Sequence, residues 1–368
     1  MNKRELCRRK ATISYDINFF SKKMRFLSML CAFLVVWIHT YNIEVYNVAN
    51  DSVVYFIEQF VRYYLGRIAV PFFFISCAFF LYNPAKKKTV KEVYESKFKS
   101  LVIPYVIWNT LYMVAFAILK HLSLTENGME HFSVENLLGG VLFYKYNSTY
   151  WYMYQLILYM LLFPLFTLIL KKGKYVSGII LLCMLGIYLW QGELVDWKTY
   201  KLISLENVIY FYIGAILGYH YREKIVYSGK LDKVKRAGIM IVSLVISIIL
   251  FFFTHVNPIL ELENFHILRK ISLIIFFFLI FDGLDFSWIN GSFWELNFLI
   301  YSMHPLVLEI IEHIIYLVFP KNTTWALIDF VAAPILTILV ICIACSVLRK
   351  ISIGLFNLLN GCRKISSN

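Results

Sequence analysis

The sequence contains little charge for its length. Asp, Glu, Lys and Arg make up 16% of its 368 residues, whereas soluble domains average about 25%. Hydrophobic residues make up 60% and aromatic residues 18%. This composition argues against a soluble globular protein and places the chain in the membrane class. The sequence also lacks an internal repeat, a low-complexity tract and a separate polar domain, so we expect one membrane domain.

The cysteines do not form the pattern of a secreted disulfide framework. Cys342 and Cys345 make a C-x-x-C, but this pair lies in an apolar run without nearby histidines, so we interpret it as helix packing and expect no metal. A cleavable signal peptide is not evident, because the first apolar run starts late and has no small-residue cleavage site. All seven cysteines lie in apolar runs or at basic termini: Cys7, Cys31, Cys77, Cys183, Cys342, Cys345 and Cys362.

Apolar runs long enough to cross a bilayer recur along the whole chain. They predict an all-α polytopic protein with about ten transmembrane helices. The domain limits that follow are a basic N-terminus at 1–23, a ten-helix membrane domain at 24–348 and a basic tail at 349–368. The predicted spans are 24–42, 64–83, 101–119, 150–170, 175–191, 204–220, 237–255, 268–283, 296–319 and 325–348.

The positive charges support this count. With a cytoplasmic N-terminus, 27 of the 36 Lys and Arg residues fall on the inside, seven fall outside, and Arg62 and Arg67 lie near the second span. Such a bias is what the positive-inside rule predicts, and it places both termini in the cytoplasm. The net charge of +13 is explained by this asymmetry, so we expect contacts with membrane lipids and none with nucleic acid.

Two residues of the first span attract attention. His39 is a titratable side chain in an apolar run, where such groups are often functional; alternatively, it marks the end of the helix at interfacial water. Arg25 precedes it by fourteen residues. On an ideal helix this spacing places the two side chains on nearly one face, about 21 Å apart.

Two further polar residues lie inside or beside the predicted spans and need an explanation. Arg67 opens the second span, and its plain interpretation is a side chain that reaches the interface and sets helix depth. His304 precedes Pro305 in the ninth span, where proline frees a backbone carbonyl; alternatively, this histidine is a hydrogen-bonded packing residue. Imidazole and guanidinium groups inside a helix bundle suit proton transfer and an anionic ligand, in an enzyme or in a transporter.

Five sequence motifs follow one another in a fixed order along the chain. They are residues 24–39 (MRFLSMLCAFLVVWIH), 66–77 (GRIAVPFFFISC), 101–108 (LVIPYVIW), 151–159 (WYMYQLILY) and 298–305 (FLIYSMHP).

Together these segments resemble the acyltransferase 3 family of integral membrane proteins, over about four-fifths of the chain. Three positions depart from the family pattern. Ser28 stands where the family usually has an arginine eleven residues before the histidine, and Arg25 lies one turn earlier. Cys77 replaces a glycine, and Thr149 with Tyr150 replaces a histidine before the tryptophan of the fourth span.

The resemblance implies transfer of a short acyl group, usually acetyl, from cytosolic acyl-coenzyme A to a hydroxyl or amine. O-acyl transfer to a cell-envelope carbohydrate or lipid-linked sugar, at the plasma membrane, is what we expect. His39 would be the catalytic base, Arg25 and Arg67 would bind the donor or the oxyanion, and His304 would position the acceptor. Acyl-coenzyme A would be a co-substrate, with no bound cofactor.

Two other functions stay open at this point. A transporter or flippase for a polysaccharide or lipid-linked sugar also accommodates polar groups in spans and aromatic walls. A structural or sensory membrane protein explains the topology but not the ordered motifs. An enzyme must bind acyl-coenzyme A and use His39 chemically, whereas a transporter need not.

Overall fold

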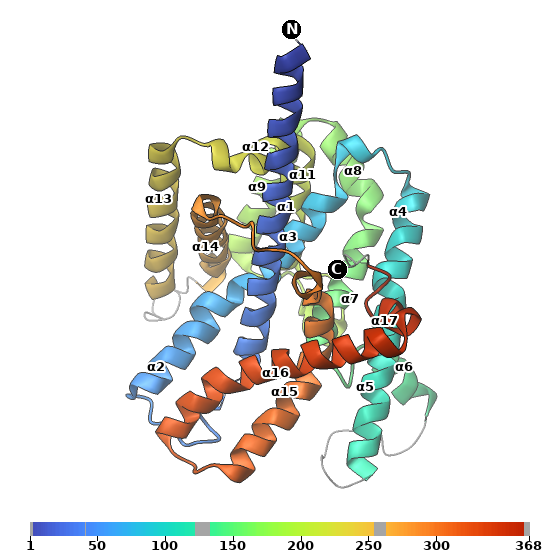
Figure 1. The fold of residues 1–368 in the computed structure, drawn as a ribbon, viewed down its shortest axis with the longest axis vertical. Helices are drawn as coiled ribbons and strands as arrows, with labels where there is room; N and C mark the ends of the chain where they lie inside the picture. Colours follow the sequence, from blue (N-terminus) through green and yellow to red (C-terminus); the bar gives the residue numbers. More distant parts are fainter. Residues whose placement is uncertain (1–2, 41, 122–132, 254–262, 364–368) are drawn as a thin grey trace.

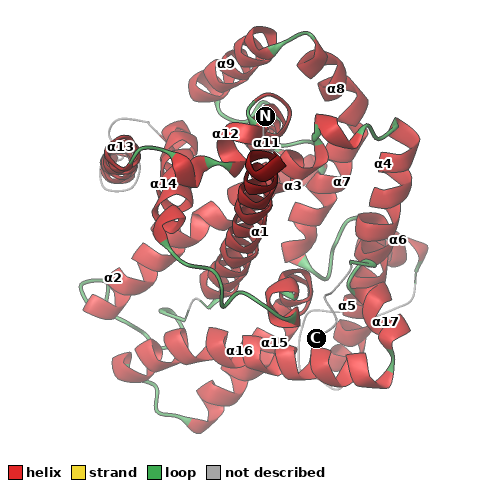
Figure 2. Ribbon diagram, turned by 45° about the horizontal axis from the view of Figure 1, so that its top comes forward, coloured by secondary structure: helices red, strands yellow, loops and turns green. Residues whose placement is uncertain are grey.

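The computed structural model describes residues 3–40, 42–121, 133–253 and 263–363. Within these residues every regular element is a helix (Figure 2), so the all-α prediction is confirmed. The α-helices are α1 (Lys3–His39), α2 (Val53–Gln59), α3 (Ala69–Leu81), α4 (Val90–Lys97), α5 (Ile103–His121), α6 (Val134–Leu142), α7 (Trp151–Leu161), α8 (Phe163–Lys171), α9 (Lys174–Gln191), α10 (Trp197–Tyr200), α11 (Leu205–His220), α12 (Arg222–Val226), α13 (Lys233–Phe251), α14 (His266–Ile280), α15 (Asn297–Val318), α16 (Thr323–Ile351) and α17 (Ile353–Leu359).

Among the described residues, six helical segments are long and apolar enough to cross a membrane. A seventh is added if the bent pair formed by α7 and α8 counts as one span. A multi-pass membrane protein is therefore confirmed. Helices are present at all ten predicted positions, but α11 and α14 have only 16 and 15 residues, and α1, which holds the first predicted span, is not among these apolar segments. The count of ten and the orientation of the termini therefore stay predictions. The six segments are Val53–Lys86, Val90–His121, Lys174–Gln191, Lys233–Phe251, Asn297–Val318 and Thr323–Ile351.

Several predicted limits differ from the structure or fall outside its described part. The second span begins earlier than expected, because α2 continues through a π-helix (Phe60–Leu65) and a short 3-10 helix (Gly66–Ile68) into α3. The fourth span bends by 55° between α7 and α8, where Pro164 lies in the first turn of α8 and ends the α7 hydrogen-bond ladder. Five stretches lie outside the described residues, among them parts of both predicted termini and of the predicted spans 24–42 and 237–255: residues 1–2, 41, 122–132, 254–262 and 364–368.

Helix α1 is the central element of the bundle. Figure 1 shows it running through the middle of the molecule, with its N-terminal turns projecting past the other helices. Helices α3, α15 and α16 pack against it, while α13 and α9 lie at the periphery (Figure 2). Its side chains from Met24 to Val36 contribute to the main apolar core. The side chains of this part of α1 are thereby placed relative to several other helices.

The closest helix pair is α3 with α11. A Cβ atom on Gly214 would lie 2.1 Å from the carbonyl oxygen of Ile75, and one on Gly218 would lie 2.4 Å from that of Phe79. Only glycine allows the two backbones to approach this far, as small residues do in membrane helix pairs generally. This contact fixes α3, which follows directly on the segment that carries Arg67.

A buried ion pair joins α1 to the segment after α14. The Lys23 ammonium and the Asp282 carboxylate are 2.5 Å apart, and both side chains are almost fully buried. Ser228 donates a further hydrogen bond to Asp282 at 3.1 Å, and the Lys23 ammonium lies 3.3 Å from the centre of the Phe278 ring. Such a pair specifies one packing arrangement, because either charge alone would be left buried without a partner.

Candidate active site

Two histidines from different helices meet inside the bundle. His39 ends α1, and His304 lies eight residues into α15. Their ring centroids are 5.3 Å apart, with the ring planes at 44°. His304 is fully buried, whereas His39 remains exposed. The structure therefore brings together two of the four predicted site residues, and it leaves the first imidazole accessible.

The His304-Pro305 sequence determines which ring nitrogen of His304 is free. Proline has no N–H, so the carbonyl of Tyr301, four residues earlier, loses its helical partner. His304 Nδ1 lies 2.8 Å from this oxygen and, because a carbonyl only accepts, Nδ1 must carry the proton. Nε2 of the neutral ring is then an acceptor, and it has no hydrogen-bond partner in the described part of the chain.

A tyrosine from α5 bridges the next backbone carbonyl and amide of the same helix, between Ser302 and Leu306. The Tyr112 hydroxyl donates to the carbonyl of Ser302 at 3.0 Å and accepts from the amide of Leu306 at 3.3 Å. The Tyr301 hydroxyl in turn donates to the carbonyl of Thr149 at 2.6 Å. These bonds hold α15 against α5 and against the 3-10 turn that precedes α7, so the backbone that carries His304 is fixed in position.

Arg67 lies beside the end of α1 that carries His39. A Cβ on Gly66 would lie 2.0 Å from Cγ2 of Ile38, so the backbone just before Arg67 packs against α1 just before His39. Arg67 belongs to the 3-10 helix that directly follows the π-helix Phe60–Leu65. Arg67 is exposed, its guanidinium lies 5.4 Å from the Tyr63 ring, and π-helical segments such as this one occur often at functional sites.

The structure places Arg25 away from the other three predicted residues. Arg25 and His39 belong to one continuous helix, so fourteen residues separate them by about 21 Å along its axis. The Arg25 guanidinium forms a salt bridge of 3.0 Å with Glu295, and 39% of its side chain is exposed. Ser28, one turn further along α1, faces the same cavity as Arg25.

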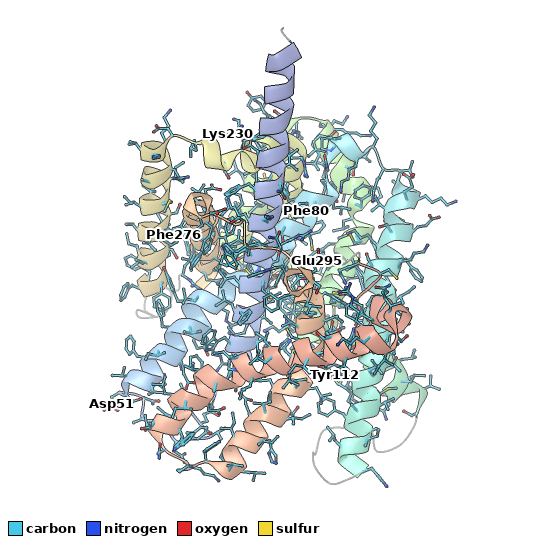
Figure 3. All side chains as sticks on the ribbon, in the orientation of Figure 1. Asp51, Phe80, Tyr112, Lys230, Phe276 and Glu295 are labelled. Atoms are coloured by element: carbon cyan, nitrogen blue, oxygen red, sulfur yellow. The ribbon has the colours of Figure 1, made fainter. Side chains whose placement is uncertain are left out.

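This cavity has a volume of about 710 Å³ and is rich in positive charge. Figure 3 labels two of the residues that line it, Phe80 and Glu295, in the middle of the bundle beside α1. Four cations face it against two carboxylates, which favours an anionic ligand. The charged lining residues are Arg25, Lys86, Arg222 and Arg363 with Glu223 and Glu295.

Sequence reasoning missed two of these cations, Arg222 and Arg363. Arg222 donates to the carbonyl of Phe79 at 3.2 Å, and Arg363 stacks 3.8 Å from the centre of the Phe298 ring. In the sequence they look like loop charges that set topology, as does Lys86 in the basic loop that also borders a second cavity of about 340 Å³. Only the bias of charge toward one side of the predicted membrane pointed to this region.

Comparison with known proteins agrees with the ordered motifs. Residues 24–349 match the family model described as an acyltransferase domain, the acyltransferase 3 family. The match begins one residue before Arg25 and contains His39, Arg67 and His304. No curated protein and no solved structure matches the chain significantly.

Proposed function

The chain belongs to the acyltransferase 3 family, and from this premise we propose that it moves a short acyl group from acyl-coenzyme A to a carbohydrate hydroxyl. The observation that carries the proposal is the contact between His39 and His304, 5.3 Å between ring centroids, together with the cationic cavity along the same central helix. The acyl group is acetyl, and the acceptor is a cell-envelope glycan or lipid-linked sugar. The protein would act in the plasma membrane.

The donor would bind in the cavity of about 710 Å³. Coenzyme A carries several phosphate groups, and guanidinium groups bind phosphate through paired N–H donors. Arg25 and Arg222 supply such groups, and Lys86 adds a further charge. Because Arg25 and Ser28 face the same cavity, Arg25 can take the place of the arginine that the family usually has at position 28.

The reaction would occur where the two imidazoles meet. His39 takes the proton of the acceptor hydroxyl as the oxygen attacks the thioester carbon, the C–S bond breaks, and the proton passes to the coenzyme A thiolate. His304 Nε2, which has no partner among the described residues, accepts a hydrogen bond from one nitrogen of His39. The other nitrogen of His39 then faces the acceptor as a base, which is how a second group orients a catalytic histidine.

Arg67 would stabilise the charge that develops on the carbonyl oxygen. Its side chain is exposed, and the residue before it, Gly66, packs against Ile38, the residue before His39. A cation aimed at the place where negative charge appears stabilises the transition state more than the ground state. Arg25 cannot serve this purpose, because it lies about 21 Å along α1 from His39. The two arginines would therefore have different roles, donor binding for Arg25 and oxyanion stabilisation for Arg67.

The proposal is tested by acyl transfer with purified protein in lipid nanodiscs. Radiolabelled acetyl-coenzyme A is supplied with a mixture of envelope glycans, and the unchanged protein is compared with His39→Ala. His313→Ala is the matched control, because His313 is an exposed histidine on α15. We expect label on glycan with the unchanged protein and with the control, and a loss of at least about 100-fold with His39→Ala.

Equal transfer by all three proteins would overturn the assignment of His39. If the unchanged protein neither transfers label nor binds coenzyme A, the enzyme proposal fails. Transport of a polysaccharide or lipid-linked sugar would then be the better account, and uptake of labelled sugar into proteoliposomes would measure it.

A further inference from the structure

The chain does not end at its last long helix. After α16 it turns at Ser352 into α17, which packs on α5 on the same side of the molecule in both views (Figures 1 and 2). Trp108 of α5 donates its indole N–H to the carbonyl of Leu359 at 3.0 Å. Phe356 and Asn360 are almost fully buried. This C-terminal segment, residues 352–363, is thus packed into the helix bundle.

Two residues with left-handed backbone conformation end α17. Gly361 has φ +67° and Cys362 has φ +53°, and a Cβ on Gly361 would lie 2.8 Å from the carbonyl oxygen of Ser100. Only glycine adopts such a conformation without strain. The turn reverses the chain against α5 and directs the next residue, Arg363, into the bundle.

Arg363 is held in place by neutral groups. Its Nη1 donates to the carbonyl of Asn360 at 2.8 Å, and its guanidinium lies 3.8 Å from the centre of the Phe298 ring. It forms no salt bridge within the described part of the chain. A guanidinium without a carboxylate partner, facing a cavity that already carries three other cations, has the properties of an anion-binding residue.

Arg363 makes its contact nearer to His304 than Arg25 does. Phe298, on which Arg363 stacks, precedes His304 by six residues on α15, a rise of about 9 Å. Arg25 contacts Glu295, which lies three residues further from His304. Of the phosphates of coenzyme A, the diphosphate is the one joined to the arm that carries the thioester, so a cation nearer the histidines should contact the diphosphate.

We propose that the C-terminal segment 352–363 completes the donor site by placing Arg363 against the diphosphate of acyl-coenzyme A. This inference rests on the proposed function and adds a residue beyond the part of the chain that matches the family, which ends at 349. The segment thereby acts as a wall of the donor cavity that lies outside residues 24–349, the part that matches the family.

The test measures binding of coenzyme A and of dephospho-coenzyme A, which lacks only the 3′-phosphate, to the protein in nanodiscs. Arg363→Gln removes the charge, and Arg363→Lys keeps it without the planar fork. Lys350→Gln is the matched control, because Lys350 is an exposed cation at the end of α16 that does not line this cavity. Thermal unfolding of each variant reports folding.

We expect Arg363→Gln to weaken both ligands by at least about tenfold, or 1.4 kcal/mol, Arg363→Lys to weaken them less, and Lys350→Gln to leave them unchanged. Turnover of S-acetyl-pantetheine, which has no phosphate, should not respond to Arg363→Gln. A merely structural role would lower that turnover too.

Two results would overturn the inference alone. Unchanged affinity in Arg363→Gln would remove the C-terminal segment from the donor site, and weaker binding of coenzyme A but not of dephospho-coenzyme A would reassign Arg363 to the 3′-phosphate. Failure of the unchanged protein to bind coenzyme A would overturn the proposed function and this inference together. Arg363→Lys serves as the deciding variant if Arg363→Gln does not fold.

Discussion

Replacing His39 and His304 singly and together tests whether the two imidazoles act as one unit. The His304 ring is 5.3 Å from that of His39, and its Nδ1 already bonds to Tyr301, so only Nε2 can serve His39. A hydrogen bond to a group that becomes charged contributes about 1.5–3 kcal/mol. Its loss should lower kcat about 10- to 150-fold, whereas loss of a general base lowers it about 10²- to 10⁴-fold.

The choice of substitution at His304 separates the two ring nitrogens. His304→Asn keeps a donor near the Nδ1 position, which preserves the bond to Tyr301, but has no acceptor at the Nε2 position. His304→Gln places an amide oxygen near Nε2 and should retain part of the activity. We expect His304→Asn to lower kcat within the stated range, and the double variant to be no slower than His39→Ala alone.

The assay is transfer of radiolabelled acetyl groups in nanodiscs, with kcat and KM measured separately. If the losses of His39→Ala and His304→Asn multiply in the double variant, the residues act independently and the relay is wrong. If His304→Asn leaves kcat unchanged, His304 only packs. A fall in kcat that His304→Gln does not relieve would mean that the Nε2 acceptor is irrelevant.

Three further predictions follow from single contacts. Glu295→Gln should tighten coenzyme A binding several-fold, because it releases Arg25 from a half-exposed salt bridge that contributes at most about 1 kcal/mol to stability. Arg25→Gln should weaken coenzyme A binding. If a binding titration shows that both variants change the affinity in the same direction, the role of Arg25 is contradicted. Gly214→Ala should destabilise the protein by about 1–3 kcal/mol or more, because the added Cβ would meet the Ile75 backbone. Gly178→Ala on α9 should be neutral, because its Cβ would meet nothing within 4 Å. Equal melting temperatures for the two variants would refute the close contact between α3 and α11. Lys23→Met should lower the free energy of unfolding by about 3–5 kcal/mol, because it leaves the Asp282 carboxylate buried without its partner. Adding Asp282→Leu should recover most of that loss in a denaturation experiment. No recovery in the double variant would contradict the buried ion pair.

Helix content and the placement of most helices follow from the sequence, because long apolar runs have few other ways to satisfy their backbone in a bilayer. The bend at Pro164 was not predicted, because the apolar run at 150–170 is continuous through the proline and predicts one span. The π-helix before Arg67 was not predicted either, since no residue type marks it. The apolar runs at 204–220 and 268–283 are themselves short, and α11 and α14 agree with them at 16 and 15 residues.

Some residues of the candidate site could be predicted from the sequence and others could not. His39 and Arg67 stood out because polar side chains in spans are costly and seldom incidental. The contact between His39 and His304 depends on the packing of α15 against α1. The position of Arg67 depends on the close contact between Gly66 and Ile38. No local pattern in the sequence records either contact. Arg363 could not be found from the sequence, because its position depends on a turn that reverses the chain some ten residues after the last span.

The most direct test of the account is the structure of the protein in nanodiscs with bound coenzyme A, determined by electron cryo-microscopy. The account predicts phosphate density in the cavity between Arg25 and Arg222, with the thiol arm extending along α1 toward His39 and His304. Coenzyme A bound elsewhere, or with its thiol pointing away from the two histidines, would contradict the assignment of this site as the centre of acyl transfer.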